Sequence, residues 1–188
     1  MVVVEIICII DRSGSMALLR QDAIGGFNTF LEEQKKLPDP ACVTLVLFNH
    51  EYKLMFEKKP LVDVAPLDGV TYVPSGTTAL LDAIGRTLDR EGHEDKGIVL
   101  VLTDGLENSS SDYTRDRVKE LIKKYEAKGW QIHYAAANQD AFVEAGRMGI
   151  HQATSFAATG QGAKSAYSSL SSAALDYRST NQPDDNSN

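Results

Sequence analysis

The chain begins with an apolar run, residues 2–10, that passes directly into the polar loop 11–15. A nearly continuous apolar run of this length is typical of a strand that is buried on both faces of a sheet. In an extended segment, residues two apart point the same way. Asp11, Ser13 and Ser15 are therefore expected to direct one carboxylate and two hydroxyls toward a common point at the end of this strand.

Strand-like and helix-like segments alternate along the rest of the sequence. The short link 49–51 predicts that the second and third strands form an antiparallel hairpin. Alternation of buried strands with helices predicts an α/β fold, with an open, mostly parallel sheet covered by helices on both faces. The expected strands are 2–10, 42–48, 52–56, 98–102, 130–137 and 151–156, and the expected helices are 17–36, 78–90, 112–128, 139–147 and a last one after Gly160 and Gly162.

Length and composition indicate one ordinary globular domain. The chain has 188 residues, of which 43% are hydrophobic and 24% are charged. A chain of this size buries a substantial core without disulfides. We expect a single domain over residues 1–178, followed by a disordered tail over 179–188, because that segment is polar and lacks apolar residues.

Composition also disfavours several classes of partner and location. The formal net charge of −7 disfavours nucleic acid, since phosphate binding requires a basic surface. No stretch approaches the roughly 20 apolar residues that a membrane span needs. The first apolar run contains Glu5 and has no basic segment before it, so we expect no secretory signal. Cys8 and Cys42 lie in apolar runs and are expected to be free thiols, which favours a reducing compartment and a cytoplasmic location.

Three polar segments are expected to meet at one edge of the sheet. Ligands of open α/β sheets bind outside the carboxyl ends of the strands, and Asp11 and Asp104 each follow a predicted buried strand. Segment 75–78 precedes a crossover helix and can reach the same edge. Each segment alone is explained more simply as a turn or a helix cap, but that explanation does not predict their common placement. Carboxylate and hydroxyl oxygens suit hard cations such as Mg²⁺.

This combination resembles the von Willebrand factor type A (vWA) family and its metal-ion-dependent adhesion site (MIDAS). The resemblance covers about residues 2–137 and looks most like the stand-alone, intracellular prokaryotic or phage-like members. It implies a doubly wound, Rossmann-type sheet of about six strands with one antiparallel edge strand, for which 52–56 is the candidate. Thr78 is a second choice for the threonine of the site. The five metal-site positions of the family are matched by Asp11, Ser13, Ser15, Thr77 and Asp104.

The resemblance implies a protein-binding module in which an Asp or Glu carboxylate of a protein partner completes the coordination of the metal. Mg²⁺ is the expected ion, with Mn²⁺ and Ca²⁺ as alternatives. Two carboxylates and three hydroxyls carry few negative charges, so the metal stays electrophilic toward an outside oxygen. The sequence offers no identifiable general base near the metal, and we expect no enzymatic activity.

Two other functions stay open at this point. One is a metal-assisted phosphohydrolase, although a haloacid-dehalogenase-like enzyme would need an aspartate at the position of Ser13, and the sequence contains no P-loop lysine motif. The other is a scaffold subunit of an ATPase or stress-response complex, with little metal dependence. Among the neighbouring polar residues, Glu107 and Asn108 are expected to be solvated loop residues, and Asn138 is expected to cap the following helix.

Overall fold

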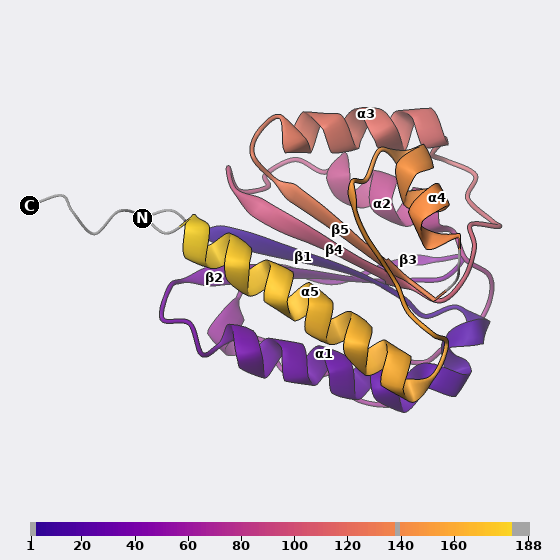
Figure 1. The fold of residues 1–188 in the computed structure, drawn as a ribbon, viewed down its shortest axis with the longest axis horizontal. Helices are drawn as coiled ribbons and strands as arrows, with labels where there is room; N and C mark the ends of the chain where they lie inside the picture. Colours follow the sequence, from indigo (N-terminus) through magenta and orange to yellow (C-terminus); the bar gives the residue numbers. More distant parts are fainter. Residues whose placement is uncertain (1–2, 138–139, 182–188) are drawn as a thin grey trace, which may run out of the picture.

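A computed structural model of the chain describes residues 3–137 and 140–181 (Figure 1). Its six strands form one sheet in the order β3-β2-β1-β4-β5-β6. Among the described strands, β2 and β3 form the antiparallel pair, and the other neighbours pair in parallel. The predicted fold class is therefore confirmed. The strands are β1 (Val4–Asp11), β2 (Ala41–Phe48), β3 (Tyr52–Pro60), β4 (Gly97–Thr103), β5 (Gln131–Ala136) and β6 (Gln152–Ser155).

Helices cover both faces of this sheet. Figure 1 shows α1 and α5 on one face and α2, α3 and α4 on the other. Among the described residues, no helix combines the length and the apolar character needed to cross a membrane. The α-helices are α1 (Arg20–Gln34), α2 (Leu80–Leu88), α3 (Arg115–Glu126), α4 (Ala141–Met148) and α5 (Gly160–Thr180), and two short 3-10 helices are η1 (Gly14–Leu19) and η2 (Leu61–Asp63).

The apolar character of β1 follows from its central place in the sheet. Ile6 and Ile10 belong to the apolar cluster under α1 and α5. Ile7 and Ile9 belong to the cluster under α2, α3 and α4. Because successive side chains of a strand point to opposite faces, a strand covered on both sides is apolar at nearly every position. All eight residues of β1 are buried.

Several element boundaries differ from the expected ones. The segment expected to start a helix at residue 17 forms η1 first, in which the Met16 amide donates to the Ser13 carbonyl oxygen (3.1 Å). Strand β3 continues past Phe56 to Pro60, because the register shifts opposite β2 and lets Pro60 pair with Cys42. The helix expected from residue 78 begins at Leu80.

The last helix extends into the segment expected as a tail. Ser179 and Thr180, expected in the tail, form the end of α5. Their hydroxyls donate to the carbonyl oxygens of Leu175 (2.8 Å) and Asp176 (3.0 Å), which satisfies the polar side chains within the helix. The rest of the expected tail, 182–188, and Asn138 lie outside the described residues.

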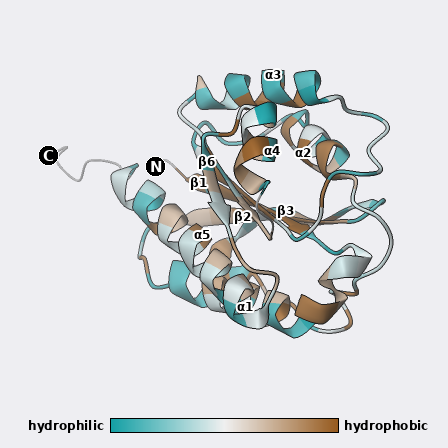
Figure 2. Cartoon of the chain, turned by 45° about the vertical axis from the view of Figure 1, so that its right-hand side comes forward, coloured by the Kyte–Doolittle hydropathy of each residue, from teal (hydrophilic) through white to brown (hydrophobic). Residues whose placement is uncertain are grey.

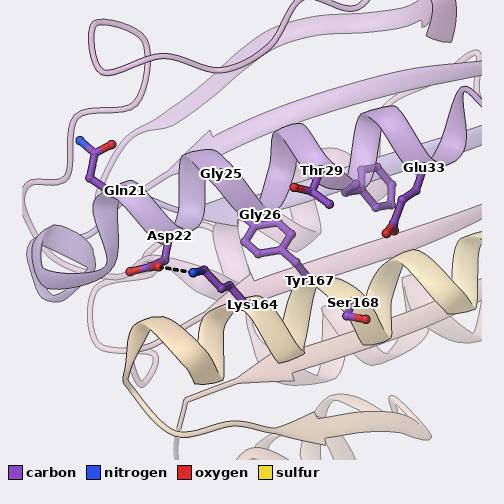
Figure 3. Close-up of a pocket in the computed structure, with 10 residues that line it drawn as sticks. Gln21, Asp22, Gly25, Gly26, Thr29, Glu33, Lys164, Tyr167 and Ser168 are labelled. Carbon is purple, nitrogen blue, oxygen red and sulfur yellow. Dashed lines mark ion pairs between the residues drawn. The ribbon is translucent and has the colours of Figure 1, made fainter.

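Helices α1 and α5 pack closely at a glycine. The aromatic ring of Tyr167 lies directly against Gly26, where an added β-carbon would overlap the ring (Figure 3). Beside this contact lies a cavity of about 490 Å³ between the two helices. Asp22 and Lys164 face each other across it, with 3.9 Å between the carboxylate oxygen and the ammonium nitrogen. A β-carbon added at Gly25, which lines the cavity, would meet no atom within 4 Å.

These neighbouring glycines predict opposite effects of the same substitution. Gly26→Ala is expected to lower the free energy of unfolding, because overpacking a close contact typically costs about 1–3 kcal/mol. Gly25→Ala is the matched control and is expected to raise it by up to about 1 kcal/mol, since alanine favours a helix interior over glycine. Urea unfolding of both variants measures the difference, and equal effects would contradict the close contact at Tyr167.

Candidate metal site

Asp11 is the last residue of β1, and its side chain is fully buried between two neighbouring strands. One carboxylate oxygen accepts a hydrogen bond from the Ser13 amide (2.6 Å). The other accepts a hydrogen bond from the Thr103 hydroxyl at the end of β4 (2.5 Å). The Asp11 carbonyl oxygen accepts a hydrogen bond from the buried Tyr72 hydroxyl (2.5 Å). Hydrogen bonds from three different segments therefore hold this residue in place.

A chain of hydrogen bonds connects the first loop to the loop that follows β4. The hydroxyl oxygens of Ser13 and Ser15 lie 3.1 Å apart. The Ser15 hydroxyl donates to the Asp104 carboxylate (2.7 Å). The structure thus brings together four of the residues predicted from the sequence, although Asp104 is far from the others along the chain.

The third segment, 75–78, lies against the first loop through its backbone. The Ser75 amide donates to the Arg12 carbonyl oxygen (2.8 Å), and the Gly14 amide donates to the Gly76 carbonyl oxygen (2.9 Å). The Asn49 side-chain amide holds the segment from the other side by donating to the Ser75 carbonyl oxygen (2.6 Å). The expected convergence of three segments at the carboxyl edge of the sheet is therefore present.

The two threonines of this segment differ in placement. Thr77 is exposed, whereas Thr78 is only 3% exposed. A β-carbon placed on Gly105 would lie 3.1 Å from the Thr78 hydroxyl oxygen and 3.7 Å from the Ser15 hydroxyl oxygen. The Thr78 hydroxyl therefore lies beside Gly105, between the first loop and the loop that carries Asp104. This placement favours Thr78, the second choice from the sequence, over Thr77.

Two residues expected to be ordinary loop residues hold this segment in place. The Thr78 amide donates to the side-chain carbonyl oxygen of Asn108 (2.9 Å), and the Asn108 amide donates to the Thr78 carbonyl oxygen (3.0 Å). The Glu107 carboxylate accepts a hydrogen bond from the Leu81 amide (2.9 Å) in the first turn of α2. Asn108 is exposed, as expected for a solvated loop residue, but both residues also hold the start of α2, because its free amides need acceptors and the loop after β4 supplies them.

Sequence reasoning also missed Tyr72. Its hydroxyl contacts the backbone of Asp11, and its ring is buried. The available signal was the one aromatic residue in segment 57–77, which also contains several aliphatic residues. No local pattern indicates that Tyr72, Glu107 or Asn108 pairs with residues so distant along the chain.

Burial dominates the electrostatics of the two carboxylates. It raises the pKa of Asp11 to about 6, against the opposing effect of the hydrogen bonds from Thr103 and Ser13, and the nearby Asp104 raises it further. Burial also raises the pKa of Asp104, partly offset by the Ser15 hydroxyl. Two acidic groups thus share a poorly solvated place in which their negative charges are disfavoured. A divalent cation would relieve that penalty.

The donor set consists of oxygen atoms. Within the described residues, no group of three or more His, Cys, Asp or Glu side chains is placed to hold a metal ion. The available donors are two carboxylates with the hydroxyls of Ser13, Ser15 and Thr78. Such ligands fit a hard cation that keeps part of its hydration shell.

Comparison with known proteins gives matches at the level of structure. No protein-family model matches the sequence, and no curated protein matches it. A von Willebrand factor type A structure from Catenulispora acidiphila aligns with a TM-score of 0.60 at 14% identity, over 93% of this chain and 43% of its own. The vWF domain of the type V pili tip protein Mfa5 from Porphyromonas gingivalis gives 0.64 at 12% identity, over 92% and 95%. This chain has a vWA-like fold.

A third match adds a metal-containing structure with the same vWA-like fold. Proximal thread matrix protein 1 from the mussel byssus, with a zinc-occupied MIDAS motif, gives a TM-score of 0.63 at 16% identity, over 90% of this chain and 47% of its own. The chain thus spans less than half of the mussel and Catenulispora proteins and corresponds to nearly the whole pilus-tip domain. Because the sequence identities are 12–16%, the matches establish only the fold. The metal ligands of this vWA-like chain are still predictions.

The threonine assignment in this vWA-like site is open to a direct test. We expect Thr78→Val to weaken Mg²⁺ or Mn²⁺ binding at least about tenfold, because it removes a donor oxygen at constant volume. Thr77→Val is the matched control and is expected to leave the affinity unchanged. Isothermal titration calorimetry with each metal measures both variants. A loss confined to Thr77→Val would restore the first choice from the sequence.

Proposed function

We propose that the chain is a divalent-metal-dependent protein-binding module. An Asp or Glu carboxylate of a protein partner completes the coordination of the metal, which is held by Asp11, Ser13, Ser15, Thr78 and Asp104. The observation that carries this proposal is the continuous hydrogen-bonded arrangement from Asp11 to Asp104, with two carboxylates whose pKa values are raised by burial. When bound, the metal would supply a positive charge and a coordination position for an oxygen atom of another protein.

The matched structures support the metal part of this proposal. The mussel protein was solved with zinc in its MIDAS motif. We propose Mg²⁺ for this chain, with Mn²⁺ or Ca²⁺ as alternatives, because an oxygen donor set suits these cations. The net charge of −7 supports a protein partner over a nucleic acid. Buried free thiols at Cys8 and Cys42 support a cytoplasmic location.

We propose a binding role over a catalytic one. Glu107 is a further carboxylate near the site, and it accepts hydrogen bonds from the amides of Leu81, Ser109 and Ser110 (2.8–3.0 Å) and from the Ser110 hydroxyl. A carboxylate with these bonds is committed to holding the loop and is poorly placed to take up a substrate proton.

A capture experiment tests the proposed function. The immobilised protein is expected to retain partner proteins from lysate in Mg²⁺ and to release them in EDTA. Asp11→Ala is expected to abolish the capture, because it removes a central metal ligand. Asp140→Ala is the matched control, since it removes an exposed carboxylate that follows β5 at the same edge.

Three outcomes would contradict the proposal. Capture that persists both in EDTA and in Asp11→Ala would show that the site is not used. Absence of metal binding by calorimetry would favour the scaffold alternative. Mg²⁺-dependent hydrolysis of p-nitrophenyl phosphate that is lost in Asp11→Ala would favour the phosphohydrolase alternative.

A further inference from the structure

Large exposed apolar side chains gather at one edge of the sheet. Within the described residues, seven such side chains are exposed, and Val62, in η2, is the one that lies elsewhere. The remaining six lie in segments that follow or face the carboxyl ends of the parallel strands. We call these six side chains the apolar rim; they are Leu18, Val70, Val73, Leu106, Phe142 and Val143.

Two rim residues lie in the loops that carry the candidate metal ligands. Leu18 belongs to η1, which also contains Ser15. Leu106 directly follows Gly105, whose β-carbon position is 3.7 Å from the Ser15 hydroxyl oxygen. Their backbones are therefore held beside the site by the same contacts that hold Ser15 and Asp104.

Val70 and Val73 lie in the segment that joins η2 to α2. The Val70 amide donates to the Asp68 carboxylate (3.0 Å), which closes a turn. This turn is tied to the start of α1, because the Arg20 guanidinium donates to the Tyr72 carbonyl oxygen (3.1 Å). Since the Tyr72 hydroxyl bonds to Asp11, both valines flank the site.

Phe142 and Val143 complete the rim from the other side. They lie in the first turn of α4, which follows the end of β5. The Ala137 amide donates to the Thr103 carbonyl oxygen (3.1 Å), so the end of β5 lies beside the residue that precedes Asp104. Figure 2 turns this edge toward the viewer, and the outer side of α3, away from the rim, is largely hydrophilic.

The fold does not require the most exposed of these side chains to be apolar. Leu18 is 93% exposed and Val70 is 87% exposed, so they add little to the core. Because the rim side chains gather at one edge, they form an exposed apolar surface. Such a surface is typical of a site that binds another protein. A metal site within an apolar surface excludes water from the bond between the metal and an incoming carboxylate, which strengthens that bond.

We propose that the apolar rim contacts large apolar side chains that flank the metal-binding Asp or Glu of the partner. This inference rests on the proposed function and names the partner's chemistry. The net charge of −7 disfavours a partner segment with many acidic residues, because the metal offers favourable contact to one carboxylate while the remaining acids meet a negative protein. The partner segment therefore presents a single carboxylate between Leu, Ile, Val, Met or Phe residues.

A displayed peptide library tests this inference. The probe is a phage library of nine-residue peptides with a fixed central Glu, bound to the protein in Mn²⁺ and eluted with EDTA. Large apolar residues are expected to be enriched at least about threefold at the flanking positions. The best peptide is expected to bind Leu18→Ser/Leu106→Ser about tenfold more weakly, because two apolar contacts are lost. Val62→Ser is the matched control and is expected to bind like the wild type.

The outcomes separate the inference from the proposed function. EDTA-eluted peptides with polar or acidic flanks, or an unchanged affinity in the double variant, would overturn the proposed contact between the apolar rim and the partner. Both results would leave the proposed metal function intact. Selection of no EDTA-eluted peptide above the Asp11→Ala background would overturn both. Metal titration of the double variant is expected to match the wild type. Self-association that is lost in the double variant would assign the rim to a second copy of the chain and overturn the inference.

Discussion

Asp11→Asn is expected to stabilise the metal-free protein at pH 7 by up to about 3 kcal/mol. Burial raises the pKa of Asp11 from 3.8 to about 6, and a tenfold change in proton affinity corresponds to about 1.4 kcal/mol. The charged form is therefore disfavoured by folding. The pKa of Asp11 is higher in the folded than in the unfolded state, so the protonated carboxyl group favours folding. This contribution of Asp11 to stability is fully present below pH 3.8 and is lost as the pH rises through about 6. Asparagine has no charge to bury and lacks this pH dependence.

The same substitution is expected to abolish stabilisation by metal. In the wild type, Mg²⁺ is expected to bind the folded state and so to raise the unfolding temperature by mass action. Thermal unfolding of both proteins from pH 4 to 8, with and without Mg²⁺, measures both effects. A wild type whose stability responds neither to Mg²⁺ nor to pH near 6 would contradict the electrostatic description of the site. Asp140→Asn, at an exposed carboxylate, is the control and is expected to behave like the wild type.

Glu5→Ala is expected to lower the free energy of unfolding by about 3–5 kcal/mol, because it leaves a buried cation without its partner. Glu5 lies near the start of β1, at the opposite edge of the sheet from Asp11, and is fully buried. Its carboxylate accepts hydrogen bonds from the Thr44 hydroxyl (2.6 Å), the His93 ring (3.2 Å) and the Glu94 amide (3.1 Å). The other His93 nitrogen faces the Thr87 carbonyl oxygen (2.9 Å), so both ring nitrogens face acceptors, an arrangement that favours the protonated, charged ring.

The pH dependence of this ion pair has two limits. Burial alone would raise the pKa of Glu5, but the hydrogen bonds from His93 and Thr44 hold it below 4.5. Burial alone would lower the pKa of His93, but the hydrogen bonds to Glu5 and Thr87 raise it above 6.5. The contribution of Glu5 is lost as the pH falls through its lowered pKa, and that of His93 is lost as the pH rises through its raised pKa. The pair therefore stabilises the fold most between pH 4.5 and 6.5.

Urea unfolding across this pH range measures the contribution of the pair. Glu57→Ala is the matched control, since Glu57 forms a partly exposed ion pair with Arg90 (2.8 Å). Exposed pairs typically contribute less than about 1 kcal/mol. Equal losses in the two variants would contradict the buried ion pair.

The sheet and its topology could be predicted because each strand carries its own signal. The apolar run of β1 predicted a central strand, and the short link after β2 predicted the antiparallel partner, β3. Four of the candidate metal residues could be predicted for the same reason, since the end of a parallel strand determines which edge its loop occupies. These predictions needed only local patterns and one rule of sheet geometry.

The contacts between loops could not be predicted in this way. Asn108 pairs with Thr78, and Tyr72 pairs with Asp11, through hydrogen bonds that depend on how three loops fold over one another. Polar residues in loops carry no periodicity, so their partners are not indicated by spacing. The choice between Thr77 and Thr78 depends on burial, which only the folded loop reveals.

The pairing of β1 with β4 has a consequence for the synthesis of the chain. Thr103, which bonds the Asp11 carboxylate, lies 92 residues after it. A ribosome therefore completes Asp11 well before the residue of β4 that donates a hydrogen bond to its carboxylate. Until β4 emerges, the nascent chain cannot close the site, and β1 lacks its central neighbour. Binding of the proposed metal is therefore expected only after β4 has been synthesised, and a truncated product that ends before β4 is expected not to bind the ion.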